Sequence, residues 1–324
     1  MSKTSDFRVT LLGTGTPIPR PDRFGPSTLV EAGDRKFLVD AGRGATIRLY
    51  QLGVAMGRID VLFLTHYHSD HTCGVPDFWL TGWLSSYYAR RTKPMRVIGP
   101  VGAKTLMAGL AEAYAADIKI RIADEKLPPE GIATIVEEFD RDGVVYEADG
   151  VRVIAFEVDH GDAIKPCYGY RFEYQGRSAV LSSDTRYNQN VIEYGRGADL
   201  LVNLANDSWL DAGDGVAADQ HLSMAVFRAI ETRRYLVRVS ATGASAFVDP
   251  GGAIYDRIPR GTSGALVADV RPRTGLTLYV RWGDWWVAVV AAMLLTVLIR
   301  HRRHRIRTLA ALAGFASACE STTA

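Results

Sequence analysis

The sequence contains little cysteine. Only three cysteines occur among its 324 residues, Cys73, Cys167 and Cys319, and no two of them form a Cys-x-x-Cys pair. This number and spacing provide no even disulfide framework and fit a reducing compartment. The N-terminus also lacks an apolar stretch behind basic residues, so we expect no secretory signal.

A broad basic surface is missing as well. The formal net charge is +2, yet the segment RHRRHRIR at 300–307 alone supplies five arginines, so the rest of the chain is slightly acidic. Proteins that bind nucleic acids usually gather positive charge on one face, because they must neutralise phosphates. The charge pattern therefore predicts no nucleic-acid partner. The charge pattern does not indicate the oligomeric state of the protein.

Short apolar runs and helical stretches alternate through the first 200 residues. FRVTLLG (7–13) and KFLVDAG (36–42) are typical of strands that end in polar or glycine turns. AKTLMAGLAEAYAA (103–116) has apolar residues at helical spacing. Hairpins are expected to turn at Asp149-Gly150 and near Gln175-Gly176. This alternation predicts an α/β domain in which helices cover sheets.

Long apolar runs are absent until the C-terminal region. Residues 283–300, GDWWVAVVAAMLLTVLIR, have tryptophans at one end and the arginine block at the other. A spanning helix needs about 20 apolar residues, so this segment is short, but its flanks are those of a membrane helix. A buried core helix is the alternative. Residues 301–324 form a basic tail.

A dense group of metal-binding residue types follows the apolar strand VLFL. The motif THYHSDHTCG carries His66, His68, Asp70 and His71. In an extended backbone His66 and His68 point to the same side, and a turn after them can aim the other two at a nearby point. Imidazole and carboxylate groups suit zinc. A single histidine is usually structural, but three with an aspartate at this spacing predict a metal site.

With this motif, residues 7–200 resemble the metallo-β-lactamase superfamily, in its arylsulfatase-like and ribonuclease Z-like branch. The similar segments also include LLGTGTPIPRPDRFGPSTLVEAG, FLVDAGRG, GVPDFWLTGW, FEVDHGDAIKPCYGYRF and LSSDTRY. The resemblance implies an αββα sandwich with the metals at the edge between its two sheets. The sequence departs from the family at Ser183, where a glycine is usual.

The resemblance also implies a role for each candidate residue. One metal is held by His66, His68 and His160. A second is held by Asp70 and His71, and Asp184 bridges the two. Asp40 supports the histidine loop from behind. Asp70 is the candidate catalytic residue, because its carboxylate can orient the nucleophile or accept its proton.

The implied cofactor is zinc, and the implied protein is a zinc-dependent hydrolase. Zinc lowers the pKa of bound water to about 7, which provides a metal-bound hydroxide at neutral pH. The expected substrate is a small-molecule ester of sulfuric or phosphoric acid, or a related acyl ester or lactone. Ribonuclease Z activity is disfavoured, because no basic, glycine-rich arm is found. The aromatic segment 77–88 either lines a substrate pocket or packs Phe78, Trp79, Trp83 and Tyr87 into the core.

The family pattern stops near residue 200. Asn203 and Leu204 stand where a His-Glu pair is expected, and no histidine follows the strand RYLVRV. Residues 198–307 instead resemble the end of the nitrilase-like domain of apolipoprotein N-acyltransferase and its last membrane helix, with Ala241 in place of an asparagine. That family's nucleophilic cysteine, glutamate and lysine lie upstream of the matched part. We therefore expect no acyl transfer.

Four segments follow from these two resemblances. Residues 1–200 are predicted to be the metal-binding domain, an αββα sandwich that is incomplete at its C-terminal end. Residues 201–282 are predicted to be the nitrilase-like fragment, 283–300 the membrane helix and 301–324 the tail. The alternative function is a membrane protein related to apolipoprotein N-acyltransferase without its catalytic residues. A third hypothesis is a metal-binding domain with weak activity.

The two halves give conflicting indications of location. The metal-binding half is expected in the cytoplasm, anchored to the inner membrane by 283–300. The arginine block after that segment predicts a cytoplasmic C-terminus, which places the preceding residues outside. A single span cannot satisfy both indications, and a gene fusion is one explanation.

His221 is open to two interpretations. It is the one histidine left that could complete the second metal's ligands, but its neighbours match the acyltransferase. We predict that it lies near the start of a helix whose buried face carries Leu222, Val226 and Ile230. The second ion should then bind weakly, with water in place of the missing imidazole.

Overall fold

The structure is a computed structural model that describes residues 6–205, 216–240, 242–262, 264–271 and 273–320. The chain divides into two compact units, residues 1–275 and residues 276–324. Residues 206–215 and Ala241, on which part of the acyltransferase resemblance depends, lie outside the described residues.

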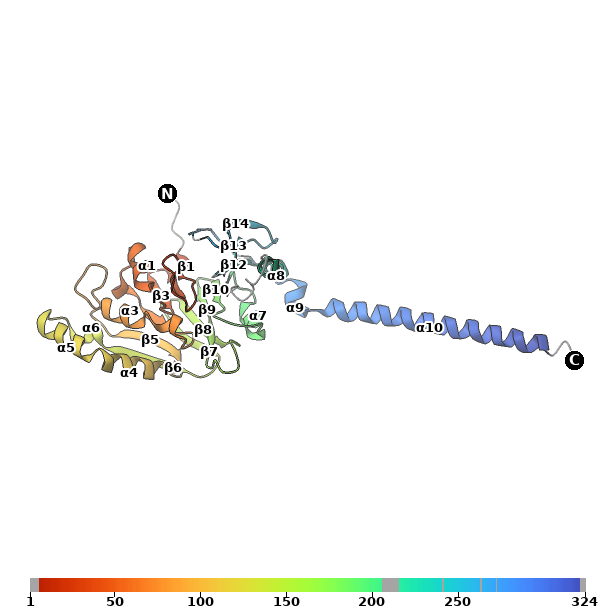
Figure 1. Cartoon of the computed structure of the whole chain (residues 1–324), viewed down its shortest axis with the longest axis horizontal. Helices are drawn as coiled ribbons and strands as arrows, with labels where there is room; N and C mark the ends of the chain where they lie inside the picture. Colours follow the sequence, from red (N-terminus) through yellow and green to blue (C-terminus); the bar gives the residue numbers. More distant parts are fainter. Residues whose placement is uncertain (1–5, 206–215, 241, 263, 272, 321–324) are drawn as a thin grey trace. The chain divides into compact units, whose positions relative to one another are not determined.

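The first unit contains a six-stranded sheet in which the strands follow sequence order (Figure 1). The first three strands pair antiparallel, and the later neighbours pair parallel. The strands are β1 (Phe7–Gly13), β2 (Ser27–Ala32), β3 (Arg35–Val39), β4 (Val61–Phe63), β5 (Met95–Pro100) and β6 (Thr134–Phe139).

An eight-stranded sheet packs against it, with the strands again in sequence order. The strands are β7 (Gly143–Ala148), β8 (Val151–Glu157), β9 (Tyr168–Tyr174), β10 (Arg177–Leu181), β11 (Leu200–Ala205), β12 (Tyr235–Ser240), β13 (Ser245–Val248) and β14 (Ile254–Ile258). The central strands β10, β11 and β12 are parallel. The sheet therefore runs without a break across residue 200 into the segment that resembles the acyltransferase.

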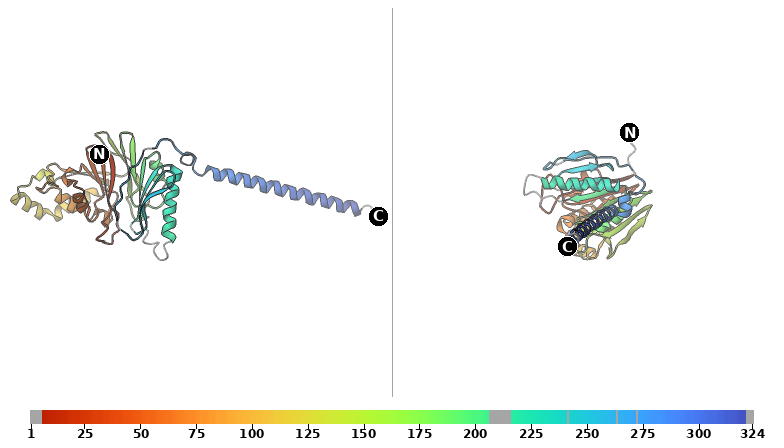
Figure 2. Two further views of the ribbon diagram at one scale, coloured as in Figure 1. Left: turned by 90° about the horizontal axis from the view of Figure 1, so that it is seen from above. Right: turned by 90° about the vertical axis from the view of Figure 1, so that its right-hand side faces the viewer.

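Helices cover the outer faces of both sheets. Figure 2 shows α4 (Ala103–Ala113), α5 (Ala115–Asp124) and α6 (Pro129–Ile132) on the side of the first sheet, and α8 (Val216–Thr232) along the outer face of the second. The shorter helices are α1 (Ala45–Gln51), η1 (Met56–Arg58), α2 (Ser69–Thr72), α3 (Val75–Thr81) and α7 (Gln189–Gly195). The order of layers is helix, sheet, sheet, helix, as predicted.

Aromatic side chains fill the space between the sheets. Phe37 and Phe63 of the first sheet and Phe172 of the second are each 0% exposed. Their ring centroids lie 5.6–6.0 Å apart in tilted and edge-on arrangements. Such pairs stabilise the fold in addition to the free energy gained from burial, and their geometry favours one alignment of the two sheets.

The aromatic segment 77–88 packs mainly into the core. Phe78, Trp79 and Trp83 are buried, and the two indole groups donate to the backbone carbonyls of Ile132 and Pro128. The core alternative is therefore confirmed for these three residues. It is wrong for Tyr87, whose side chain is 73% exposed, because α3 ends at Thr81 and the chain then turns outward.

The second unit consists of α9 (Leu278–Trp282) and α10 (Trp285–Glu320). By length and composition, the window Trp285–Arg302 of α10 is the one candidate membrane span among the described residues, with a mean hydropathy of 1.4. The helix continues beyond the predicted segment 283–300, through the arginine block.

Candidate metal centre

The histidine motif lies where the first sheet ends. Strand β4 leads through Leu64 and Thr65 into His66, which is buried, and then His68, which is exposed. The next residues form the single turn of α2, which carries Asp70 and His71 on its buried side. The other two candidates come from the second sheet, with His160 after β8 and Asp184 after β10. The fold thus brings all six predicted residues to one edge.

Asp40 holds this loop in place from behind. Its side chain is buried and accepts hydrogen bonds from the backbone nitrogen of Thr65 at 2.8 Å and from its hydroxyl at 2.7 Å. His71 Nδ1 lies 2.7 Å from the same carboxylate. The acceptor fixes the proton on Nδ1, which leaves Nε2 directed into the site. The sequence indicated Asp40 through the resemblance but missed Thr65, although Thr65 directly precedes His66.

Three histidine nitrogens converge on one point. His66 Nε2 lies 3.0 Å from His68 Nδ1, and His160 Nε2 lies 3.3 Å from the same atom. Ligands about 2.0–2.1 Å from a tetrahedral zinc ion are separated by roughly 3.3 Å. These three side chains therefore have the spacing of ligands around a single ion.

A second group of ligand atoms lies next to the first. His71 Nε2 lies 3.5 Å from Asp184 Oδ2 and 3.9 Å from Asp70 Oδ2. Asp184 Oδ2 is also 3.8 Å from His160 Nε2, which places this carboxylate between the two groups. His71 Nε2 is buried without a hydrogen-bond partner. A buried polar atom of this kind is costly, and a metal ion would satisfy it, so the residues fit a metal.

The electrostatics favour ligand-ready forms for two of these residues. Burial and the nearby His71 lower the pKa of His66 to about 3, so His66 is a neutral imidazole at physiological pH. Burial raises the pKa of Asp184, but His71 outweighs this effect and the pKa falls to about 2. For His71, burial disfavours the charged form, and the charge of Asp40 outweighs it and raises the pKa to about 10. These opposed shifts are typical of a functional site.

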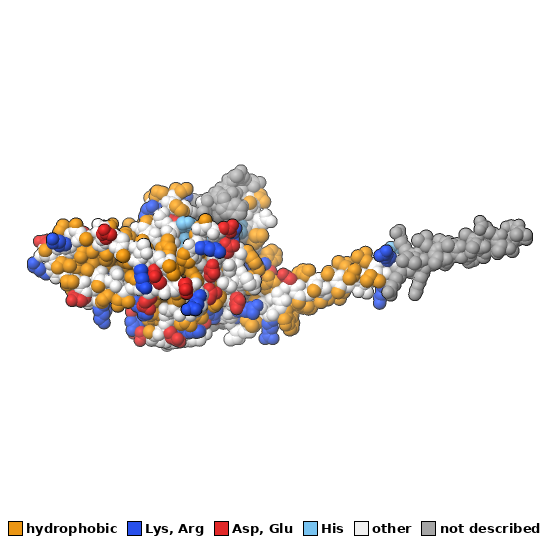
Figure 3. All heavy atoms as spheres, turned by 90° about the horizontal axis from the view of Figure 1, so that it is seen from below, with side chains coloured by type: hydrophobic (Ala, Val, Ile, Leu, Met, Phe, Trp, Pro, Cys, Tyr) orange, Lys and Arg blue, Asp and Glu red, His pale blue; other side chains and the backbone are white. Residues whose placement is uncertain are grey.

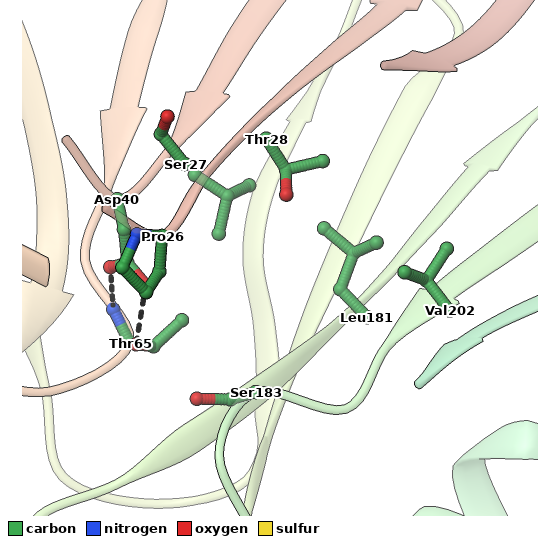
Figure 4. A pocket seen from close by; sticks show the side chains of 9 residues that line it. Pro26, Ser27, Thr28, Asp40, Thr65, Leu181, Ser183 and Val202 are labelled. Carbon is green, nitrogen blue, oxygen red and sulfur yellow. Dashed lines mark hydrogen bonds between the residues drawn. The ribbon is translucent and has the colours of Figure 1, made fainter. Parts of the chain in front are cut away.

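A small cavity separates the two sheets behind Asp40 (Figure 4). Ser27 lines it from β2 and Ser183 from the loop after β10, and its volume is about 20 Å³, room for one water molecule. Ser27 Oγ is buried without a hydrogen-bond partner. Ser183 has a φ of 58°, the left-handed backbone that favours the glycine expected there.

The centre is accessible from solvent. His68 is exposed and His160 is half-buried. Figure 3 shows histidine atoms, in pale blue, at the surface in the view from below. Basic and acidic side chains are interspersed across the same view. A substrate group can therefore approach the histidines without a rearrangement of the core.

His221 belongs to neither group of candidate ligands among the described residues. It lies in the second turn of α8, and Leu222 on the same helix is buried. The predicted buried face is wrong at Ile230, which is 42% exposed. Ala225 and Ala229 are buried instead.

Comparisons with known proteins identify the family of residues 7–211. Residues 7–211 match the family model described as Anti-Pycsar protein Apyc1. The chain belongs to this family. It is 41% identical over 200 residues to ribonuclease Z of Mycobacterium marinum, covering 61% of this chain and 70% of the relative. For ribonuclease Z of Mycobacterium avium the identity is 43%, with 61% and 69% covered.

Human tRNase Z, short form, has a similar structure, with a TM-score of 0.52 and 21% identity, over 65% of this chain and 81% of the human chain. The fold is that of the metallo-β-lactamase superfamily, and the protein is a metal-dependent hydrolase of that fold. The matches support the ribonuclease Z side of the predicted resemblance. The arylsulfatase side has no support from them.

A second family model overlaps the first. Residues 179–277 match the model described as Carbon-nitrogen hydrolase. The two matches share residues 179–211, which contain most of β10 and all of α7 and β11. The C-terminal region is therefore similar to carbon–nitrogen hydrolases, and the two matches meet within one strand–helix–strand unit.

The comparisons overturn the predicted partners. A small-molecule ester substrate without nucleic acid was expected, but the mycobacterial relatives that the chain matches are named ribonuclease Z. The prediction was wrong because net charge describes the whole surface. A hydrolytic centre needs to engage only the phosphates next to the cleaved bond, and metal ions can supply positive charge there.

Proposed function

We propose that the protein is a metal-dependent phosphodiesterase that hydrolyses RNA. The observation that carries this proposal is the convergence of His66, His68 and His160 beside Asp184, with the buried Nε2 of His71 3.5 Å from the carboxylate of Asp184. Support for the substrate class comes from the ribonuclease Z relatives. A phosphodiester is one of the ester classes that such a centre can hydrolyse.

We propose zinc as the metal, held by His66, His68 and His160. When bound, zinc supplies a Lewis acid and lowers the pKa of water to about 7. The protein's part is to hold these imidazoles in the right orientation. Burial keeps His66 uncharged, and the hydroxyl of Thr65 lies 2.9 Å from its Nδ1. Asp70, on the buried side of α2, is the group proposed to accept the proton of the nucleophile.

A second ion is proposed between Asp70, His71 and Asp184, bound more weakly than the first. These three side chains are the proposed protein ligands, because His71 Nε2 lies 3.5 Å from Asp184 Oδ2 and 3.9 Å from Asp70 Oδ2. Among the described residues His221 lies in neither ligand group. Water would complete the coordination. This arrangement weakens the electrostatic stabilisation of the transition state and favours a slow enzyme.

Protonation of the leaving oxygen is the step least supported by the chain. Asn203 stands in the parallel strand next to β10, at the edge near Asp184. An amide does not release a proton at neutral pH, so Asn203 cannot supply that proton, and we propose solvent as its source. We therefore propose that substrates with good leaving groups are hydrolysed faster, relative to RNA, than expected for a complete site.

We also propose a role for each segment of the chain. Residues 1–200 carry the ligands, and 201–282 supply strands of the second sheet. Residues 283–300 anchor the protein to the inner membrane with the metal centre in the cytoplasm, and 301–324 form the basic tail. The support for anchoring is the apolar composition of Trp285–Arg302.

The proposal is tested with a structured precursor RNA, purified protein, and zinc added or chelated. Cleavage that requires zinc and is lost in His68→Ala supports it. Cleavage that persists with chelator, or hydrolysis of small esters without any cleavage of RNA, contradicts it. Protease protection in membrane vesicles tests the anchor separately.

A further inference from the structure

The loop between β1 and β2 links the metal motif to the C-terminal strands. Arg23, in this loop, donates hydrogen bonds to the backbone carbonyls of Ser240 and of Thr262, the latter at 3.1 Å. Ser240 ends β12, and Thr262 follows β14. One arginine of the metal-binding half therefore contacts two turns of the half that resembles carbon–nitrogen hydrolases.

The same loop packs closely against the backbone of Asp70. A Cβ at Gly25 would lie 2.7 Å from the nitrogen of Arg43 and 2.9 Å from the carbonyl oxygen of Asp70. A Cβ at Gly42 would collide with the same carbonyl and with Gly25. These three backbone segments are packed so closely that a shift of the loop must shift Asp70. Helix α2, which carries Asp70, is a single turn, so its own hydrogen bonds provide little resistance to such a shift.

The position of Ser240 follows from the sheet. Because β10, β11 and β12 are parallel, their carboxyl ends lie on one edge. The end of β10 leads to Asp184, and the end of β12 is Ser240. The Ser240 turn is closed by its own hydroxyl, which accepts from the nitrogen of Gly243 at 2.9 Å. Arg23 is half-buried against this turn, so its hydrogen bonds are partly shielded from water.

We propose that Arg23 is a positioning residue that fixes Asp70 by tying the β1–β2 loop to the C-terminal strands. In this arrangement the segment that resembles carbon–nitrogen hydrolases helps to position Asp70, although its described residues contribute no ligand. Its influence passes through Arg23 and Gly25 of the β1–β2 loop. The inference rests on the proposed second ion at Asp70. It predicts an effect on that ion and none on the ion at His66, His68 and His160.

The test compares Arg23→Gln and Arg23→Lys with a matched control, Arg20→Gln. Arg20 is in the same loop, its side chain is exposed, and it forms an ion pair with neighbouring Asp22. Zinc and cobalt titrations measure the affinity of each ion, and the cobalt absorption spectrum reports ligand geometry. Circular dichroism and the Tm of the metal-free proteins show whether each variant is folded.

We expect Arg23→Gln to weaken the second ion about 10-fold, in the range seen when partners of metal ligands are removed. The first ion should keep its affinity, Arg23→Lys should recover part of the loss, and Arg20→Gln should match wild type. Unchanged binding of the second ion in folded Arg23→Gln, or equal weakening of both ions, overturns the proposal. If Arg23→Gln does not fold, wild-type affinity in Arg23→Lys overturns it. RNA cleavage is not measured, so failure here is distinguishable from failure of the proposed function.

Discussion

Asp40 and His71 share a buried hydrogen bond of 2.7 Å, which points the free Nε2 of His71 toward Asp184. The pair joins the end of β3 to α2, and Thr65 completes the network on the same carboxylate. The geometry of the candidate ligands therefore depends on a residue that is not itself placed as a ligand.

Replacing Asp40 with asparagine should weaken the affinity for the ion that His71 binds about 10- to 100-fold, because the orientation of His71 is lost. Zinc titration monitored by calorimetry measures this effect. Asp60→Asn is the control, since Asp60 also holds a backbone nitrogen and an arginine of the first sheet but lies outside the metal centre. Equal affinity in wild type and Asp40→Asn contradicts the role given to Asp40.

Removing His66 should abolish tight zinc binding, because this buried imidazole is a proposed ligand of the tightly bound ion and its Nε2 lies 3.0 Å from His68 Nδ1. Metal content after gel filtration is expected to fall from about one equivalent to near zero in His66→Ala. Zinc should also raise the Tm of wild type and not of the variant, since only a bound metal stabilises the folded state. Retention of one tight equivalent in the variant would sink the ligand assignment.

His221→Ala should leave zinc stoichiometry and both affinities unchanged, because His221 lies in neither ligand group. The measurement is a zinc titration of both proteins side by side. If wild type binds two ions tightly and His221→Ala loses one, then His221 is the missing ligand.

Ser183→Gly should stabilise the protein by about 1 kcal/mol, because a left-handed backbone is costly for a residue with a Cβ and free of that cost for glycine. Thermal unfolding of the metal-free protein measures it, as a rise in Tm of a few degrees. Ser182→Gly is the matched control. Ser182 does not have a positive φ, so its replacement should lower the Tm. A lower Tm for Ser183→Gly would contradict the strain argument.

Local sequence signals predicted much of the first unit. Both hairpins turn where expected, with positive φ at Asp149 and Gly150 and at Gln175 and Gly176. FRVTLLG forms β1 over the predicted residues, and the ligand-type side chains converge as the resemblance implied. These features could be predicted because turn residues, strand periodicity and ligand spacing can be recognised within short stretches of sequence.

Long-range relationships were not predictable in this way. The two resemblances divided the chain near residue 200, but β11 and β12 pair as parallel neighbours and continue one sheet. No local pattern indicates that Arg23 contacts residues more than 200 positions later. Exposure of Tyr87 and Ile230 was also missed, because a periodic apolar pattern does not show where a covering layer ends. The assignment of each ion to its ligands stays a prediction.

The most direct measurement is the rate of RNA cleavage by wild type and by Asp184→Asn, with zinc and with chelator. Asp184 lies between the two ligand groups, and the amide keeps its size while removing its charge. We predict zinc-dependent cleavage by wild type, loss of that cleavage with chelator, and a drop of at least about 100-fold in Asp184→Asn. Cleavage by Asp184→Asn at the wild-type rate, or by wild type without metal, would contradict the account.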